Sequence, residues 1–206
     1  MTIRLCTHPL AQHLLTGLRS TETDPQHFRP LARRLTTILA LEATDNLPSI
    51  ATPITTPLEA MEGQTLAHGL VVIPILRAGL AMLEPFLDLF PNVSVGYIGL
   101  ERDHQTAVAA SYYCKLPSVS GQTTLVVDPM LATGGSANQA IALVKAAGGT
   151  DVRLVCVVAA PEGVAAVNDA HPDVPIYAAA LDRELNEKKY ICPGLGDFGD
   201  RLYGTL

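Results

Sequence analysis

Short apolar strands alternate with helical segments from residue 70 onward, and this alternation constrains the fold more than any other feature of the sequence. Strands are expected at Leu70–Leu76, Val93–Leu100, Thr123–Asp128, Val152–Ala160 and Ile176–Leu181, and helices at Leu80–Leu89, Ala137–Ala147 and Gly163–Ala170. Apolar strands joined through helices are typical of a parallel sheet covered on both faces. The sequence therefore predicts an α/β fold whose ligands bind at the C-terminal strand ends, where Arg77, Arg102 and Asp128 fall.

The first 60 residues have a different pattern. Apolar residues at helical spacing predict helices over Pro9–Ser20 and Phe28–Asn46, and Thr52–Pro57 reads as a short edge strand bounded by prolines. The second helix carries Arg29, Arg33 and Arg34, which we expect on a solvated face.

The stretch Leu125–Ser136 reads as a buried strand that leads into a phosphate-binding turn. Three apolar residues carry Asp128 to the strand end, and Thr133–Ser136, with the sequence Thr-Gly-Gly-Ser, offers unshielded backbone N–H groups at a helix start. The alternative is a tight turn in which Ser136 is the N-cap of the helix. A carboxylate suits hydroxyl groups and N–H groups suit a phosphate, so the pair favours a ribose 5-phosphate as ligand.

This stretch resembles the site for 5-phospho-α-D-ribose 1-diphosphate (PRPP) in the type I phosphoribosyltransferases. Most members have a second acid after the first; here Pro129 takes that place, a feature that resembles the uracil phosphoribosyltransferases. The resemblance implies that Asp128 holds the ribose hydroxyls and that the following loop holds the 5-phosphate. The PRPP-binding residues implied in this stretch are Asp128, Pro129, Met130, Leu131, Ala132, Thr133, Gly134, Gly135 and Ser136.

Two further segments resemble PRPP-binding parts of the same family. Val72–Gly79 is similar to the diphosphate loop, in which Arg77 would present a planar fork of donors to diphosphate oxygens. The alternative is an arginine paired with a surface carboxylate. The apolar pattern lapses in Glu101–Gln122, which resembles the mobile lid of the family, with Arg102 as its PRPP-binding arginine. A plain β-hairpin is compatible with such a lid, and Lys115 within it receives no role.

Near the C-terminus, Tyr190–Asp200 resembles the uracil-binding loop of the family. Uracil presents a donor at N3 between two acceptors, which backbone N–H and C=O groups can match, whereas cytosine reverses the pattern at positions 3 and 4. The resemblance implies main-chain contacts to uracil from Ile191, Gly196 and Phe198, with Asp197 facing PRPP and also counted at the uracil site. Cys192 and Phe198 depart from the residues common in the family. An irregular terminal loop is the alternative.

The implied reaction is transfer of the phosphoribosyl group from PRPP to N1 of uracil, giving UMP and diphosphate in pyrimidine salvage. Arg77, Arg102, Asp128 and Asp197 are the expected catalytic residues. Asp197 either assists deprotonation at N1 or holds a magnesium-bound water, and the sequence leaves both open. No carboxylate cluster resembles a metal cage, so Mg²⁺ is expected to arrive bound to PRPP and water.

The resemblance runs from His8 to Thr205 and implies a type I phosphoribosyltransferase fold, with a parallel sheet flanked by helices and a small hood formed by terminal segments. We expect one domain over residues 1–206, with N-terminal helices at about 8–47 and a core at about 66–182. The lid is expected at about 101–122 and the uracil-binding loop at about 190–200. The family also implies a homodimer or larger assembly, and GTP as an allosteric activator of some members.

Charge and cysteine usage exclude other classes of function. The net charge is −6 and no basic run is present, so we expect no nucleic-acid partner. The four cysteines (Cys6, Cys114, Cys156, Cys192) lack metal-binding spacing and favour a reducing compartment. No signal peptide or membrane span is recognisable, so we expect a cytoplasmic protein without membrane contact.

Two competing functions are less consistent with the sequence. A phosphoribosyltransferase for purines or orotate would not share the Asp128-Pro129 pair and the Pro-Gly-Leu-Gly-Asp sequence of residues 193–197. A regulatory protein that keeps the fold and binds RNA would be expected to have a basic face, which this acidic chain lacks.

Overall fold

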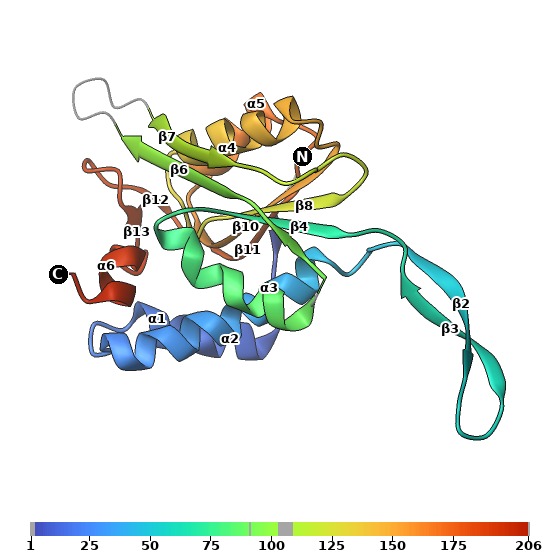
Figure 1. The fold of residues 1–206 in the computed structure, drawn as a ribbon. Coiled ribbons are helices and arrows are strands. Elements are labelled where there is room, and N and C mark those ends of the chain that lie inside the picture. Colours follow the sequence, from blue (N-terminus) through green and yellow to red (C-terminus); the bar gives the residue numbers. More distant parts are fainter. Residues whose placement is uncertain (1–2, 91, 103–108, 206) are drawn as a thin grey trace.

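A mostly parallel sheet forms the centre of the protein (Figure 1). The structure is a computed structural model that describes residues 3–90, 92–102 and 109–205. The strand order is β1-β11-β10-β8-β4-β6-β7. These strands span Arg4–Leu5, Ile176–Leu181, Asp151–Ala159, Thr123–Val127, Leu70–Leu76, Tyr97–Arg102 and Ala109–Lys115, respectively. Within this order only β7 is antiparallel to its neighbour, so the expected α/β architecture is confirmed.

The register of the central strands brings their C-terminal ends to one edge of the sheet. In β4 and β8, Pro74 pairs with Val127, and in β10 and β8, Val155 pairs with Val127. The chain segments that follow β4 and β8 therefore start side by side. Two short strands complete the sheet: β5 (Ser94–Val95) pairs with β4, and β9 (Met130–Leu131) pairs with β10.

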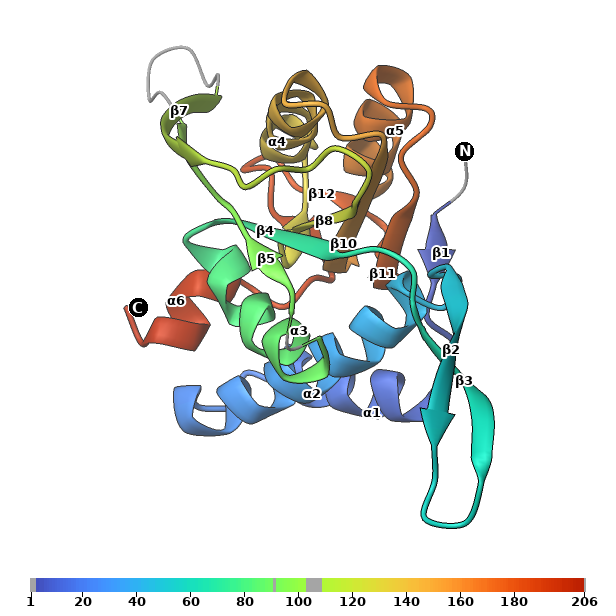
Figure 2. The same ribbon diagram turned by 45° about the vertical axis from the view of Figure 1, so that its right-hand side comes forward.

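Helices cover both faces of the sheet (Figures 1 and 2). One face is covered by α4 (Gly135–Ala146) and α5 (Pro161–Ala170). The other face is covered by α1 (Pro9–Arg19), α2 (Pro25–Ala43), the 3₁₀ helix η1 (Ala78–Met82) and α3 (Leu83–Leu89).

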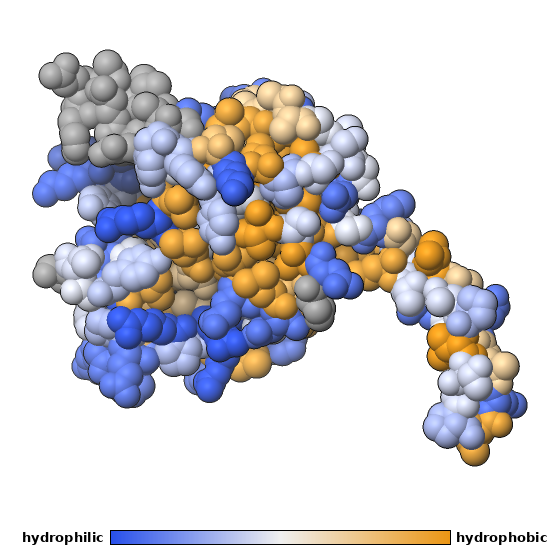
Figure 3. Space-filling view, viewed as in Figure 1, coloured by the Kyte–Doolittle hydropathy of each residue, from blue (hydrophilic) through white to orange (hydrophobic). Residues whose placement is uncertain are grey.

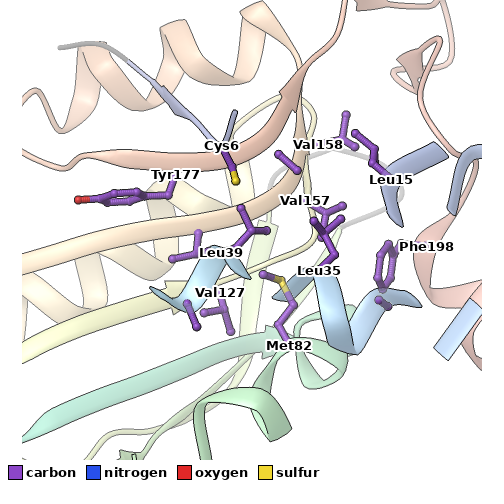
Figure 4. Packing of buried hydrophobic residues seen from close by; sticks show 14 of the residues in the cluster. Cys6, Leu15, Leu35, Leu39, Met82, Val127, Val157, Val158, Tyr177 and Phe198 are labelled. Carbon is purple, nitrogen blue, oxygen red and sulfur yellow. The ribbon is translucent and has the colours of Figure 1, made fainter. Parts of the chain in front are cut away.

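Neighbouring residues of one strand supply the cores on opposite faces, because side chains alternate across a sheet. Val127 packs in the cluster that includes Leu35 and Leu39 of α2, as Figure 4 shows, whereas Val126 packs with Ile141 of α4. Strands buried on both faces explain the long apolar runs in the sequence.

Most expected elements are present, with shifted ends. Helix α2 begins at Pro25 instead of Phe28, because Asp24 caps it: Oδ1 of Asp24 accepts a hydrogen bond from the N–H of His27 at 2.8 Å. Proline suits the first position of a helix, where its missing N–H leaves no donor unpaired. The expected strand Val93–Leu100 is divided between β5 and β6, with Gly96 between them.

A two-stranded arm projects from the body of the molecule (Figures 1 and 2). It consists of β2 (Ser49–Thr55) and β3 (Ala60–Leu66), which pair along their whole lengths. Only one strand was expected here, over Thr52–Pro57. The second strand has no buried face, so it carries no apolar alternation that could reveal it.

The C-terminal segment is more regular than expected from its sequence. It contains a small hairpin of β12 (Glu184–Leu185) and β13 (Ile191–Cys192), followed by α6 (Phe198–Tyr203). In the lid region, β6 and β7 form an antiparallel pair, and residues 103–108 lie outside the described part. Within the described ranges, every helix is too short or too polar to cross a membrane.

Candidate active site

Asp128 lies at the C-terminal edge of the sheet, directly after β8. Its N–H donates to the carbonyl of Val155 at 3.1 Å, which continues the β8–β10 pairing by one residue. Burial raises the pKa of the Asp128 carboxyl to about 7, and a hydrogen bond from the N–H of Met130 opposes this rise only in part. The neighbouring Cys156 thiol also has a raised pKa, through burial and the charge of Asp128. The carboxyl therefore needs a partner that donates hydrogen bonds to its ionised form.

The turn from Thr133 to Ser136 has the form of an anion cradle at the N-terminus of α4. Gly134 has φ +82°, in the left-handed region, and a Cβ there would lie 3.0 Å from both the carbonyl of Gly163 and the Cβ of Ala166. Gly135 is exposed, and a Cβ on it would meet only the hydroxyl of Thr133, at 3.8 Å. The first N–H groups of a helix have no acceptor within the helix, so they are available to an anion.

Hydrogen bonds to β10 fix the segment between Asp128 and this cradle. The carbonyl of Pro129 accepts from the N–H groups of Val157 at 2.9 Å and Val158 at 3.0 Å, and the N–H of Ala160 donates to Leu131 at 2.9 Å. Pro129 and Leu131 are themselves buried, so the segment turns Met130 and Ala132 toward the site. A small cavity of about 70 Å³ is lined by Asp128, by residues 130–137 and by Leu154.

Arg77 follows β4 at the same edge and is exposed. The peptide bond between Leu76 and Arg77 is cis. A Cβ on the nearby Gly79 would lie 2.6 Å from the carbonyl of Val127, so η1 packs tightly against the end of β8. Among the described residues, the guanidinium of Arg77 has no ion-pair or hydrogen-bond partner. The group is thus available to an anionic ligand beside Asp128.

The C-terminal loop lines a second cavity, of about 320 Å³. Its lining includes four predicted site residues, Ile191, Gly196, Asp197 and Phe198, together with Met130 and Ala132 of the Asp128 loop. Phe198 is only 2% exposed, and its ring packs edge to face on that of Phe28, at 5.0 Å between centroids. Because the side chains of Ile191 and Phe198 are buried, these two residues can offer the cavity mainly their backbone groups.

Asp197 is exposed at the N-terminus of α6 and caps that helix. Its Oδ1 accepts from the N–H of Asp200 at 2.9 Å. The carboxylate therefore has one oxygen engaged in the cap, while Asp197 also lines the cavity.

Lys188, Lys189 and Tyr190 also line this cavity, and sequence reasoning did not single them out as site residues. The side chain of Asn186 shapes their turn, since its Oδ1 accepts from the N–H groups of Lys188 at 3.0 Å and Tyr190 at 2.9 Å. The available signal in the sequence was the pair of adjacent lysines directly before the C-terminal loop.

Arg102 is the last residue of β6, where its backbone pairs with Ala109. Its side chain lies outside the described part of the chain, as do residues 103–108 of the expected lid. The search for metal sites covered the described residues alone, and found no group of three or more His, Cys, Asp or Glu side chains able to hold an ion. In this region Asp128 and Asp197 supply the carboxylate oxygens.

Comparisons with known proteins agree on one family. The family model for uracil phosphoribosyltransferase matches residues 5–205. A uracil phosphoribosyltransferase of Thermosipho africanus is 50% identical over 207 residues, which cover 100% of both chains. A solved structure of a protein from Aquifex aeolicus has a TM-score of 0.93 at 35% identity and covers 98% of each chain. A hypoxanthine-guanine phosphoribosyltransferase of Bacillus anthracis shares the fold alone, with a TM-score of 0.53 at 12% identity, over 77% of this chain and 80% of that chain.

Proposed function

Because the chain belongs to the uracil phosphoribosyltransferase family, we infer that it converts uracil and PRPP to UMP and diphosphate, and we propose roles for its site residues. The family assignment made from the sequence motifs is confirmed, and so is the phosphoribosyltransferase fold. The reaction is a glycosyl transfer that salvages a free pyrimidine.

One observation supports the site assignment above the others: Met130 and Ala132 line both cavities. The phosphate cradle and the cavity of the C-terminal loop therefore share a wall. A ribose 5-phosphate in the first and a flat base in the second would meet at this wall, where the bond between C1′ and N1 has to form. Such positioning of two reactants can supply much of the rate acceleration.

On the phosphate side, we propose that the N–H groups and hydroxyls of Thr133–Ser136 bind the 5-phosphate and that Asp128 accepts hydrogen bonds from the ribose hydroxyls. Donors of this kind stabilise the ionised carboxylate, which burial disfavours. Arg77 and Arg102 would face the diphosphate and stabilise the negative charge that grows on it as the bond to C1′ breaks.

The residues that the structure describes fit a Mg²⁺ ion bound mainly through substrate oxygens, because they provide single carboxylates instead of a cluster. Bound in this way, the ion would neutralise charge on the leaving diphosphate. Asp128 and Asp197 are the side chains that could hold its water ligands.

On the base side, we propose that the backbone at Ile191, Gly196 and Phe198 reads the donor and acceptor pattern of uracil. Cytosine would leave buried backbone groups unpaired, at a cost on the order of 1–3 kcal/mol for each group. Asp197 would face N1, whose proton has to leave as the new bond forms, either as its acceptor or through a water molecule.

The direct test is the release of diphosphate from PRPP and Mg²⁺ with uracil, cytosine, hypoxanthine or orotate as the base. We expect release with uracil only. Release of diphosphate with another base would refute the proposal that the backbone selects uracil. No release with any of the four bases would refute the catalytic assignment and favour a regulatory protein of the same fold.

We also propose a homodimer or higher homo-oligomer, in which the β2–β3 arm contributes to the contact between copies. Figure 3 shows hydrophobic surface along the arm. The arm exposes Ile50, Ile54, Leu58 and Met61, and Leu58, between its two strands, is 94% exposed. An apolar surface on a projecting element is a common mark of a protein–protein contact. A second copy of the chain is the simplest occupant, and light scattering at assay concentrations tests it.

Two further properties are proposed from the family resemblance. Activation by GTP is tested by adding the nucleotide to the uracil assay and measuring the initial rate. A cytoplasmic location is supported by the four cysteines, all of which are free thiols. Fractionation of the native cells tests that location.

A further inference from the structure

Two arginines that line neither of the two site cavities hold the main chain of the C-terminal loop in place. The first is Arg19, the last residue of α1, which forms a two-pronged ion pair with Asp182 at 2.8 and 2.6 Å. Asp182 follows β11 directly, and its side chain is 5% exposed. Ion pairs of this geometry are among the more strongly oriented side-chain contacts.

The Arg19–Asp182 pair binds both polar groups of one loop residue, Gly194. Asp182 accepts from the N–H of Gly194 at 2.7 Å, and Arg19 donates to the carbonyl of Gly194 at 2.7 Å. Gly194 has φ +61°, and a Cβ on it would lie 2.1 Å from the carbonyl of Ile191. Both the N–H and the carbonyl of Gly194 are therefore held by the ion pair, at a position where a side chain would not fit.

The second arginine, Arg201 of α6, holds the next residue of the loop. It donates to the carbonyl of Leu195 at 2.8 Å and to the carbonyl of Leu18. Its other terminal nitrogen donates to the carbonyls of Ser20 at 2.5 Å and Thr23 at 3.3 Å. The guanidinium also lies 4.7 Å from the ring centroid of Phe28. Arg201 thus joins the loop to the end of α1 and the turn that follows it.

We propose that the Arg19–Asp182 pair and Arg201 are positioning residues that set the backbone of residues 194–198 and thereby control binding of the pyrimidine base. The inference rests on the proposed role of this loop in reading uracil. When main-chain groups bind the base, no side chain can move to adjust the fit. The position of the base then depends on the contacts that hold the main chain in place. The proposed sites of the substrate phosphates lie elsewhere, at the start of α4 and after β4, so the KM for PRPP is expected to depend little on these residues.

The test compares Arg19→Gln and Arg19→Lys in the full chain. Arg19→Gln is expected to raise the KM for uracil at least about tenfold, equivalent to about 1.4 kcal/mol, while the KM for PRPP changes less than about twofold. Lysine can restore the charge pair with Asp182, but it lacks the planar fork that also reaches Gly194. Arg19→Lys is therefore expected to recover thermal stability without recovering the KM for uracil.

Arg153→Gln is the matched control. Like Arg19, Arg153 forms an ion pair, with Asp151, and binds a main-chain carbonyl, that of Ala43 at the end of α2, at 2.7 Å. It lies near the start of β10, opposite the site. This variant is expected to lose stability and keep both KM values. If Arg19→Gln raised both KM values in proportion to lost stability, or if Arg19→Lys restored the KM for uracil, the inference would be overturned.

Amide hydrogen exchange in the wild-type protein is a second test of the inference, and it needs no variant. The N–H of Gly194, bound by Asp182, is expected to exchange at least about tenfold more slowly than that of the exposed Gly196. Equal exchange would overturn the inference. If the wild-type protein fails to use uracil, the proposed function fails; if it uses uracil while Arg19→Gln keeps its KM, only the positioning role fails.

Discussion

At the scale of single residues, the carboxyl of Asp128 lies where burial disfavours its ionised form. With a folded-state pKa of about 7 against 3.8 for a free carboxyl, Asp128 binds a proton more tightly in the folded protein than in the unfolded chain. The free energy of unfolding therefore falls as pH rises between about 4 and 7. Asp128 thus reduces the stability of the folded protein at neutral pH. Residues that bind a ligand often have such a cost in stability.

Replacing Asp128 with Asn should remove this pH dependence. At pH 8 the variant is expected to be more stable than the wild type by roughly 1–3 kcal/mol, since each unit of pKa shift corresponds to about 1.4 kcal/mol and part of the residue still meets solvent. At pH 4 to 5 the two proteins are expected to be almost equally stable. Urea denaturation without ligand measures the difference, and parallel pH curves for the two proteins would contradict it.

The two glycines of the phosphate cradle should respond differently to alanine. Gly134→Ala places a side chain at φ +82° against Gly163 and Ala166, so the free energy of unfolding is expected to fall by roughly 1–3 kcal/mol. The new methyl group of Gly135→Ala would meet only the hydroxyl of Thr133, at an ordinary contact distance of 3.8 Å, so stability is expected to change by less than about 0.5 kcal/mol.

The same alanine at Gly135 would stand where the 5-phosphate approaches the helix, so the KM for PRPP is expected to rise at least about tenfold. Thermal melts and initial rates on both variants test the pair. A Gly135→Ala protein with an unchanged KM would place the phosphate elsewhere.

At the scale of elements, Asp197 has two roles that can be tested separately: it caps α6, and it is proposed to act on N1 of uracil. Asparagine caps helices about as well as aspartate, whereas loss of the cap to alanine costs about 1 kcal/mol. Asp197→Asn should therefore keep the stability that Asp197→Ala loses. If the carboxylate also accepts the proton of N1, Asp197→Asn is expected to lower kcat at least about a hundredfold and to change its pH profile. Unchanged turnover and pH profile in Asp197→Asn would leave this residue with the cap alone.

The elements that could be predicted from the sequence are those whose pattern is local. Strands β4, β8 and β10 are apolar runs buried on both faces, and the Asp128 loop is one continuous motif, so neighbouring residues were sufficient. Strand β3 was missed because its residues are mostly exposed, and β9 because it has two residues.

The supports of the C-terminal loop could not be predicted, for a different reason. Arg19 and Asp182 are separated by 163 positions, and Arg201 and Leu18 by 183. Neither arginine belongs to a recognisable motif. The carbonyls that they bind are main-chain groups, which every residue has, so the sequence does not mark them as partners. Only the fold brings such groups together.

At the scale of the whole molecule, the arm is the part with the least internal support. Its strands pair with each other and expose most of their residues, so their apolar side chains gain little within one chain. Assembly with another copy would bury them and is the natural source of their stability.

Replacing Ile54, Leu58 and Met61 together with serine should therefore weaken the oligomer. We expect the mass measured by light scattering to fall to that of the monomer at low micromolar concentrations, while the thermal stability of the body changes little. Leu41→Gln is the control, because Leu41 is 55% exposed on α2, outside the arm. Equal masses for the triple variant and the wild type would contradict a role of the arm in assembly.

The inward-facing side chains of Ile191 and Phe198 also have a consequence for laboratory evolution. Substitutions at these positions would alter the core before they altered the pyrimidine site, since both side chains are buried and Phe198 packs edge to face against Phe28. A selection that proceeds by single codon changes therefore has few routes to a new base preference. Recombination that exchanges residues 186–201 as a block, together with the partners of Arg19 and Arg201, is the more accessible route to an enzyme for another nucleobase.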